Sequence, residues 1–205
     1  MRVRIKICGI TCESDALEAA EAGADAIGLV FHPASPRCVA VDRAAAIVRA
    51  VGPFVTTVGL FVDAAPARVR QVLAATGLHL LQLHGSEPPE YCAQFGIPYL
   101  KALRMRPGLD PAAAAAAYPD AAGLLFDAWD PQVAGGTGTR FDWSLLPAQR
   151  RQPLILAGGL SPANVAAAVR QVRPYAVDVS SGVETAPGIK NPQLIRDFIA
   201  AARSG

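Results

Sequence analysis

The sequence predicts an α/β protein in which eight strand–helix units close into one (β/α)8 TIM barrel. Short apolar segments alternate eight times with alanine-rich segments, which indicates parallel strands joined by right-handed helical crossovers. The 205 residues suffice for a compact barrel of this kind. A doubly wound open sheet, the competing fold, needs fewer strands and does not explain why the last two strands both end in small residues. Because the composition shows no break, we expect a single domain over residues 1–205.

The first strand is expected over residues 2–9, where charged and β-branched apolar residues alternate. This alternation places Arg4, Lys6 and Cys8 on one face, which we expect to line the barrel interior. Apolar segments bounded by turn signals predict the other seven strands at residues 26–32, 54–62, 78–84, 99–103, 123–127, 154–157 and 176–180.

The helices are expected where a capping residue precedes a run of good helix formers. Thr11 or Ser14 is expected to cap the first helix and Ser161 the seventh, while Gly23 and Gly77 end the first and third. The predicted helices cover residues 15–20, 41–51, 66–76, a segment after 85–89, 110–117, 143–146, 162–172 and 192–202.

The overall composition excludes several classes of function. Apolar residues make up 52% of the chain, charged residues 18%, and the formal net charge is +2, so we expect neither disorder nor a basic surface for nucleic acid. No apolar run is long enough to span a bilayer and the charged start leads into a strand, so we expect no membrane segment and a cytoplasmic protein. The four cysteines are expected to be reduced and lack the spacing of a zinc site, so no metal is expected.

Small residues end the last two predicted strands, where this fold commonly binds phosphate through backbone N–H groups. A glycine loop at 135–138 follows the sixth strand and can bring further N–H groups from the side. The alternative is that these glycines only form tight turns. Because both strand ends fall where the barrel binds phosphate, we expect an anion site for a small phosphorylated metabolite. The candidate residues are Gly135, Gly136, Gly158, Gly159, Ser180, Ser181 and Gly182.

Acid–base chemistry has two candidates at the carboxyl ends of strands, Cys8 and Asp127. The first and sixth strands face each other across a barrel, so these groups can act on opposite sides of one ligand. A thiol is mostly protonated at neutral pH, so a basic Cys8 needs activation, for which Lys6 is a candidate unless Asp178 neutralises it. The alternative is that Cys8 is a small buried apolar residue. Asp127 ends an apolar strand, where a buried carboxylate needs either a hydrogen-bonded or charged partner or a catalytic role, such as that of a general acid.

Other polar residues near the predicted mouth of the barrel have alternative interpretations. Arg37 suits a carboxylate on the ligand, or else it is a solvated loop charge. His84 and Gln82 are either ligand contacts or hydrogen-bond partners at a strand end. His32 has no companion histidine to suggest a metal, and the chain lacks the glycine motifs of nucleotide sites, so no cofactor is expected.

Sequence motifs that contain these residues occur at 6–11 (KICGIT), 23–28 (GADAIG), 31 with 35–37 (F, SPR), 82–85 (QLHG), 126–127 (FD), 135–138 with 141–143 (GGTG, FDW), 156–160 with 162 and 164–165 (LAGGL, P, NV) and 177–184 (VDVSSGVE). In this order they resemble the phosphoribosylanthranilate isomerase family of tryptophan biosynthesis. Small departures from the family pattern are Ala176 and Asn191, where a glycine and an acid are usual.

The resemblance implies a cofactor-free Amadori rearrangement of N-(5-phosphoribosyl)anthranilate to 1-(2-carboxyphenylamino)-1-deoxyribulose 5-phosphate. It implies that Cys8 is the general base and Asp127 the general acid. Arg37 would meet the anthranilate carboxylate and Asp178 would lie near the ribose, with His84 as a further candidate for substrate binding. The glycine and serine strand ends would hold the phosphate.

Two rival functions remain open at this point. Lys101, on the predicted fifth strand, is a candidate for a Schiff base with a carbonyl substrate, as in an aldolase-type lyase. A barrel that binds a phosphorylated ligand without chemistry is the non-enzymatic alternative, against which the presence of both Cys8 and Asp127 argues. The sequence allows either a monomer or a homodimer.

Overall fold

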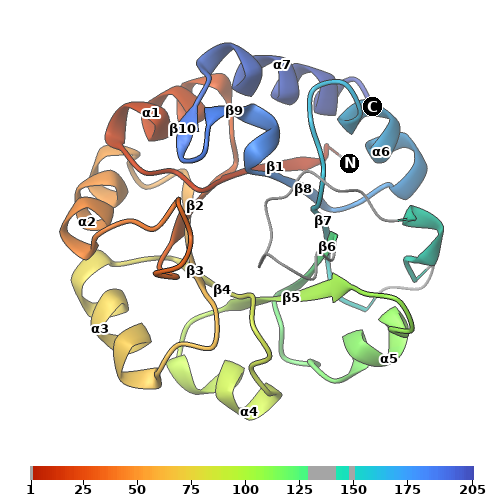
Figure 1. The fold of residues 1–205 in the computed structure, drawn as a ribbon, viewed down its shortest axis with the longest axis horizontal. Helices are drawn as coiled ribbons and strands as arrows, with labels where there is room; N and C mark the ends of the chain where they lie inside the picture. The colour runs from red at the N-terminus through yellow and green to blue at the C-terminus, as the bar shows by residue number, and fades with distance from the viewer. Residues whose placement is uncertain (1, 129–141, 148–150) are drawn as a thin grey trace.

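The computed structural model describes residues 2–128, 142–147 and 151–205, and its eight parallel strands close into a barrel (Figure 1). Neighbouring strands follow chain order, and the last, β8 (Ala176–Val179), pairs with the first, β1 (Arg4–Cys8), to complete the ring. Helices surround the strands as an outer layer (Figure 1). The predicted (β/α)8 barrel is therefore confirmed.

Every predicted strand is present, and most are shorter than the apolar segments suggest. The second and fourth strands end at Val30 and Leu83, so that His32 and His84 lie just past them, although the His84 N–H still donates to the Phe61 carbonyl at 2.9 Å. The difference arises because periodicity reports burial, and residues just past a strand, such as Phe31, are buried as well. The remaining strands are β2 Ala26–Val30, β3 Thr56–Phe61, β4 Leu80–Leu83, β5 Tyr99–Met105, β6 Gly123–Ala128 and β7 Leu154–Leu156.

The α-helices begin close to their predicted positions, but two predicted caps are wrong. Cys12 is the N-cap of the first helix and makes no side-chain capping bond, while Thr11 Oγ1 instead donates to the Gly188 carbonyl. Asn164, not Ser161, is the N-cap of the helix predicted over residues 162–172, and its Oδ1 accepts from the Ser161 N–H. The helices are α1 Glu13–Ala22, α2 Val41–Ala50, α3 Pro66–Thr76, α4 Pro89–Cys92, α5 Pro111–Ala116, α6 Val165–Val172 and α7 Pro192–Arg203.

The segment before β7 departs most from the predicted strand–helix alternation. Residues 143–146, expected to be helical, form a single 3-10 turn, η2 (Trp143–Leu145), whose first N–H groups include that of Ser144, bonded to Asp142 Oδ1. The turn ends there because Pro147 disfavours a helical conformation in the residue before it. A second 3-10 turn, η1 (Ala93–Phe95), extends the short α4.

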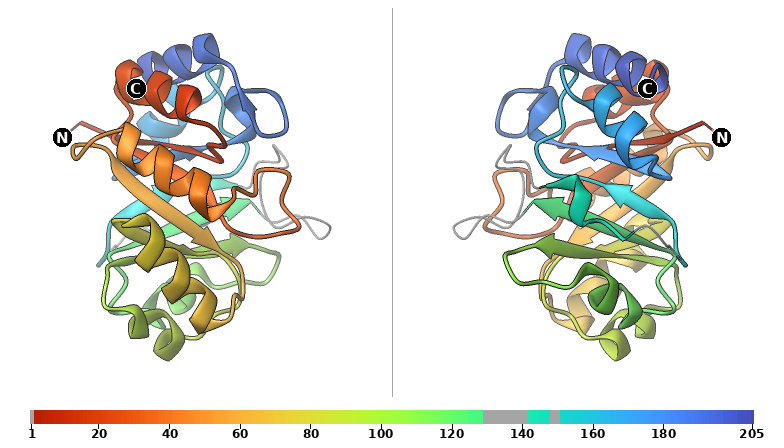
Figure 2. Two further views of the ribbon diagram at one scale, coloured as in Figure 1. Left: turned by 90° about the vertical axis from the view of Figure 1, so that its left-hand side faces the viewer. Right: turned by 90° about the vertical axis from the view of Figure 1, so that its right-hand side faces the viewer.

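A small β-hairpin follows β8 and was not expected from the sequence. Its strands, β9 (Glu184–Ala186) and β10 (Ile189–Lys190), are antiparallel and come directly after a 3-10 turn, η3 (Ser181–Val183). Figure 2 places this hairpin at the same end of the barrel as the loop that follows β2. The hairpin therefore belongs to the end of the fold where strands point their carboxyl termini.

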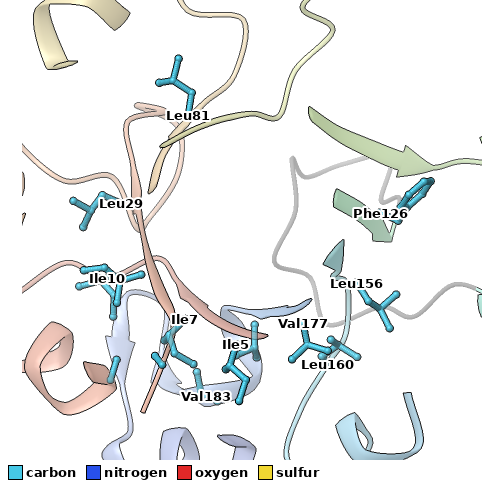
Figure 3. Packing of buried hydrophobic residues seen from close by; sticks show 14 of the residues in the cluster. Ile5, Ile7, Ile10, Leu29, Leu81, Phe126, Leu156, Leu160, Val177 and Val183 are labelled. Carbon is cyan, nitrogen blue, oxygen red and sulfur yellow. The ribbon is translucent and has the colours of Figure 1, made fainter. Parts of the chain in front are cut away.

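The hydrophobic core has two layers, one outside and one inside the ring of strands. Ile5, Ile7 and Val177 belong to the outer layer, between strands and helices (Figure 3). Leu125 and Ile155 belong to the inner layer, inside the barrel. The alternation along β1 is thus confirmed, with isoleucines outside and Lys6 and Cys8 inside. None of the described helices is long and apolar enough to cross a membrane.

Candidate active site

A cavity opens at the carboxyl ends of the strands, and most of the predicted site residues line it. The lining combines polar groups from opposite sides of the barrel with the apolar side chains of Val30, Leu60 and Val62. The predicted residues that line it are Cys8, Arg37, His84, Asp127, Gly158, Gly159, Asp178, Ser180 and Ser181. Gly135 and Gly136 lie outside the described residues.

Cys8 lies at the end of β1, next to Gly28 of β2 in the strand register. A Cβ on Gly28 would lie 2.7 Å from Cys8 Sγ and 3.0 Å from Lys6 Nζ. The missing side chain of Gly28 therefore leaves the space in which the thiol and the ammonium group meet. Burial raises the pKa of the Cys8 thiol, and the positive charge of Lys6 offsets this in part. Activation by Lys6 is thus present but weaker than the effect of burial.

Lys6 forms a buried ion pair with Asp178, which lines the cavity. The β1–β8 register sets the two residues side by side, and Lys6 Nζ donates to Asp178 Oδ1 at 2.9 Å. Burial would lower the pKa of Lys6, but attraction by Asp178 and Cys8 outweighs it and holds that pKa above its usual value. Lys6 therefore stays protonated, and the sequence-based suggestion that Asp178 pairs with it is confirmed.

Asp127 is held in the wall by a chain of hydrogen bonds from β4. His84 Nε2 lies 3.1 Å from Asp127 Oδ2, and Gln82 Nε2 lies 2.9 Å from His84 Nδ1. Gly158 faces the other carboxylate oxygen, since a Cβ there would lie 2.9 Å from Asp127 Oδ1. His84 thus has the strand-end bonding role that the sequence analysis considered, while also lining the cavity.

Arg37 is not a solvated loop charge. Its Nε donates to Glu184 Oε1 at 2.9 Å and its Nη2 to Glu184 Oε2 at 2.7 Å, a bidentate pair in which the arginine side chain is only 11% exposed. The Ser35 hydroxyl accepts from the Arg37 N–H at 3.2 Å and fixes the loop backbone. Arg37 also belongs to the cavity lining.

The ends of β7 and β8 form the part of the cavity expected to bind an anion. Gly158 and Gly159 both have left-handed backbone conformations, with φ of 84° and 63°, which favour glycine. The Ser180 hydroxyl is buried with no hydrogen-bond partner among the described residues, and it lines the cavity. Gly182 does not line the cavity; a side chain there would collide with the Leu160 carbonyl, so its glycine serves close packing.

Lys101 lies outside this cavity, at 2% exposure, and its ammonium group is fully engaged. Its Nζ donates to the carbonyls of Leu83 and Gly85 and to Glu87 Oε2, at 3.2, 2.7 and 2.7 Å. An ammonium group with three acceptors has no free lone pair to attack a carbonyl. The Schiff-base interpretation of Lys101 is therefore not favoured.

A family model described as N-(5'phosphoribosyl)anthranilate (PRA) isomerase matches residues 5–201. The chain belongs to this family. The isomerase of Pseudomonas aeruginosa (strain UCBPP-PA14) is 59% identical over 202 residues, covering 98% of this chain and 96% of the relative. That of Thiobacillus denitrificans (strain ATCC 25259 / T1) is 57% identical over 204 residues and covers all of both chains.

Solved structures of phosphoribosylanthranilate isomerases share the fold over nearly the whole chain. The Thermotoga maritima enzyme has a TM-score of 0.91 and 43% identity, covering 99% of this chain and 100% of its own. A structure of the isomerase in complex with reduced 1-(o-carboxyphenylamino)-1-deoxyribulose 5-phosphate has a TM-score of 0.85 and 38% identity, covering 99% of this chain and 100% of its own. Monomers made from the dimeric Thermotoga maritima isomerase match with the same score, identity and coverage.

Sequence reasoning on this isomerase missed three residues that shape the site. Gly28 and Glu184 appeared only inside matched motifs, and no role was expected for Lys190. The sequence position of Glu184 could have indicated it, because an acidic residue four positions after Ser180 is expected to lie near the predicted anion site.

None of the described ranges contains a cluster of three or more metal-ligating side chains.

Proposed function

We propose that this chain catalyses the Amadori rearrangement of N-(5-phosphoribosyl)anthranilate to 1-(2-carboxyphenylamino)-1-deoxyribulose 5-phosphate, a step of tryptophan biosynthesis. The observation that carries the proposal is that Cys8 of β1 and Asp127 of β6 line one cavity. A base and an acid on opposite walls suit a reaction that moves protons at two atoms of one sugar. The family supports the same assignment.

Asp127 is the proposed general acid for the first step. Its proton goes to the furanose ring oxygen, the bond from C1 to that oxygen breaks, and the nitrogen lone pair forms a C1=N Schiff base. The hydrogen bond at 3.1 Å from His84 supports this role, because it fixes the carboxyl group in the wall. Asp127 ends the step as a carboxylate.

Cys8 is the proposed general base for the second step. The thiolate takes the proton from C2, and the released electron pair forms C1=C2 while the C1=N electrons return to nitrogen. The enol then tautomerises to the ketone as C1 takes up a proton, so the reaction needs no further reactant. Lys6, protonated beside Cys8, supports thiolate formation by its charge.

The two ends of the cavity are proposed to bind the two anionic ends of the substrate. Arg37 would meet the anthranilate carboxylate through the guanidinium end that Glu184 leaves open. Gly158, Gly159 and Ser180 would hold the phosphate, with Ser181 beside them. Asp178 would lie near the ribose. The unpartnered Ser180 hydroxyl favours a ligand at that end, since a buried hydroxyl without a partner is costly.

The experiment that tests the function is fluorescence-monitored conversion of N-(5-phosphoribosyl)anthranilate by the purified chain in the presence of a metal chelator. Conversion to the deoxyribulose product is expected, and chelation should leave it unchanged. Binding of the substrate without any turnover would favour the alternative, a barrel that binds phosphorylated ligands without chemistry.

We propose that one chain carries a complete set of the groups above, in a cytoplasmic monomer or homodimer. Light scattering on the purified chain separates the two states. Equal turnover per chain across dilution through any dimer dissociation is the expected result.

A further inference from the structure

Glu184, the first residue of β9, accepts hydrogen bonds from two cations that come from different parts of the chain. Arg37, in the loop after β2, donates through both Nε and Nη2, and Lys190 of β10 donates from Nζ to Oε1 at 2.6 Å. The Glu184 side chain is 4% exposed and that of Lys190 is fully buried. The bidentate contact therefore occurs out of solvent, where such pairs are geometrically demanding.

The hairpin that carries Glu184 is itself fixed to the barrel. The Lys190 N–H donates to Asp15 Oδ2 at 3.2 Å, and Thr11 Oγ1 donates to the Gly188 carbonyl at 2.8 Å. Lys190 Nζ also donates to the carbonyl of Ser180 at 3.1 Å. Glu184 is thus a fixed acceptor, and the lysine that supports it also holds the backbone at the proposed phosphate end.

The Arg37 side chain has little freedom to point elsewhere. A Cβ on Gly9 would lie 2.5 Å from Arg37 Cδ, so the aliphatic part of the arginine crosses directly over the glycine backbone. Glu184 then occupies the Nε edge of the guanidinium, and the opposite end remains for a ligand. Arg37 and Lys190 against one carboxylate leave one unit of positive charge in the cluster, which favours an anion at that end.

Burial would raise the pKa of Glu184, but hydrogen bonds from Arg37 and the charge of Lys190 outweigh it and hold that pKa below its usual range. Glu184 is therefore a carboxylate at neutral pH, as the bidentate contact requires. From this geometry we infer that Glu184 is a positioning residue, which aims Arg37 at the carboxylate of the substrate. The inference rests on the proposed function and adds a residue that does not itself line the cavity.

A purely structural role, closing the hairpin through Lys190, is the competing explanation for Glu184. It does not explain why both carboxylate oxygens bond to Arg37, which lies 147 residues away and outside the hairpin. The two explanations also differ in what they predict. A positioning residue changes substrate binding through Arg37 alone, whereas a structural residue changes stability regardless of what stands at position 37.

The test is a double-mutant cycle between Glu184→Gln and Arg37→Ala, assayed with N-(5-phosphoribosyl)anthranilate. Glu184→Gln is expected to raise KM about tenfold or more, the scale of hydrogen bonds to charged groups, while kcat stays within about threefold. In the Arg37→Ala background the same change should alter KM by less than about twofold. Glu18→Gln, which removes an exposed pair with Arg196, is the matched control and should leave KM unchanged.

An unchanged KM in Glu184→Gln, or an equal rise with and without Arg37, would overturn the inference. If Glu184→Gln does not fold, the cycle is run with Glu184→Asp, which keeps the charge but shortens the reach; a KM increase that depends on Arg37 supports positioning, and one independent of Arg37 overturns it. Wild-type protein with no turnover would instead refute the proposed function, which keeps the two failures distinguishable.

Discussion

Two buried lysines of this barrel, Lys6 on β1 and Lys101 on β5, are each paired with an acid and each lie near a cysteine. Lys6 Nζ bonds to Asp178 at 2.9 Å and faces Cys8 across the space left by Gly28. Lys101 bonds to Glu87 and to two backbone carbonyls, and its charge lowers the pKa of Cys92 against the larger effect of burial.

The two lysines differ in the acceptors of their ammonium N–H groups. The three N–H groups of Lys101 donate to three protein acceptors, so Lys101 holds the loop after β4 in place and has no N–H group left for a ligand. Among the described residues, Lys6 donates to one such partner, Asp178, which lines the cavity, and the Cys8 thiol is a further neighbour. Burial and an ion pair alone therefore do not distinguish a structural lysine from one proposed to serve a reaction. The distinguishing feature is whether protein acceptors occupy every side of the ammonium group.

The largest expected effect is on stability, at the structural pair. Lys101→Met leaves Glu87 charged and buried without its cation, and should lower the free energy of unfolding by about 3–5 kcal/mol. Urea denaturation measures this loss, and adding Glu87→Gln should recover part of it. Turnover per folded chain should stay within about threefold. A large fall of kcat in protein shown to be folded would contradict a purely structural role for Lys101.

The next largest expected effect is on turnover, at the two proposed acid–base residues of the cavity. Cys8→Ala and Asp127→Asn should each lower kcat at least about 100-fold, the range for a positioned base or acid, with substrate binding largely kept. Cys92→Ala removes a buried thiol outside the cavity and should leave kcat unchanged, which makes it the control for Cys8. Wild-type turnover in either active-site variant contradicts its assigned role.

A smaller effect is expected when the space between Lys6 and Cys8 is filled. Gly28→Ala places a methyl group 2.7 Å from Cys8 Sγ and 3.0 Å from Lys6 Nζ, so one of them must move. We expect kcat to fall about tenfold, with a stability loss of about 1–3 kcal/mol from overpacking. Steady-state kinetics and thermal melts measure the two. Unchanged kcat together with unchanged stability would show that the gap does not serve the thiol.

The smallest effect concerns the reactivity of the two buried thiols towards iodoacetamide, followed by mass spectrometry of the peptides. Since burial holds the pKa of Cys8 above its usual value, its thiolate fraction and alkylation rate should rise about tenfold per pH unit through neutral pH. Lys6→Met removes a charge that lowers this pKa, so Cys8 should react several-fold more slowly. Cys92, with a pKa of about 11, should be unaffected. Equal slowing of both thiols would contradict a specific contact with Lys6.

The sequence was sufficient for the features that depend on local pattern. The alternation along β1 placed Lys6 and Cys8 inside the barrel, and the proline and glycine at the ends of α3 gave its limits as observed. The position of a residue at a strand's carboxyl end then followed from the fold alone. This is why most of the predicted site residues line the cavity.

Features that depend on distant residues were missed. The hairpin of β9 and β10 is fixed by Thr11 and Asp15 from the other end of the chain, and no local signal reports such contacts. Arg37 could not be distinguished from a solvated loop charge because its partner Glu184 lies 147 residues away. The predicted Thr11 cap failed for a related reason, since Thr11 bonds to Gly188 in preference to its own helix.

The closure of the ring by β1 and β8 has a consequence for how the chain matures. Lys6 and Asp178 are 172 residues apart in sequence, so the ion pair beside the thiol forms only after β8 has left the ribosome. Contacts between residues so far apart in sequence form slowly, because the chain loses the entropy of loop closure before the stabilising contacts are made. A folding intermediate without β8 would leave Lys6 unpaired and the cavity open on one side. The onset of isomerase activity during refolding would therefore report the moment of barrel closure.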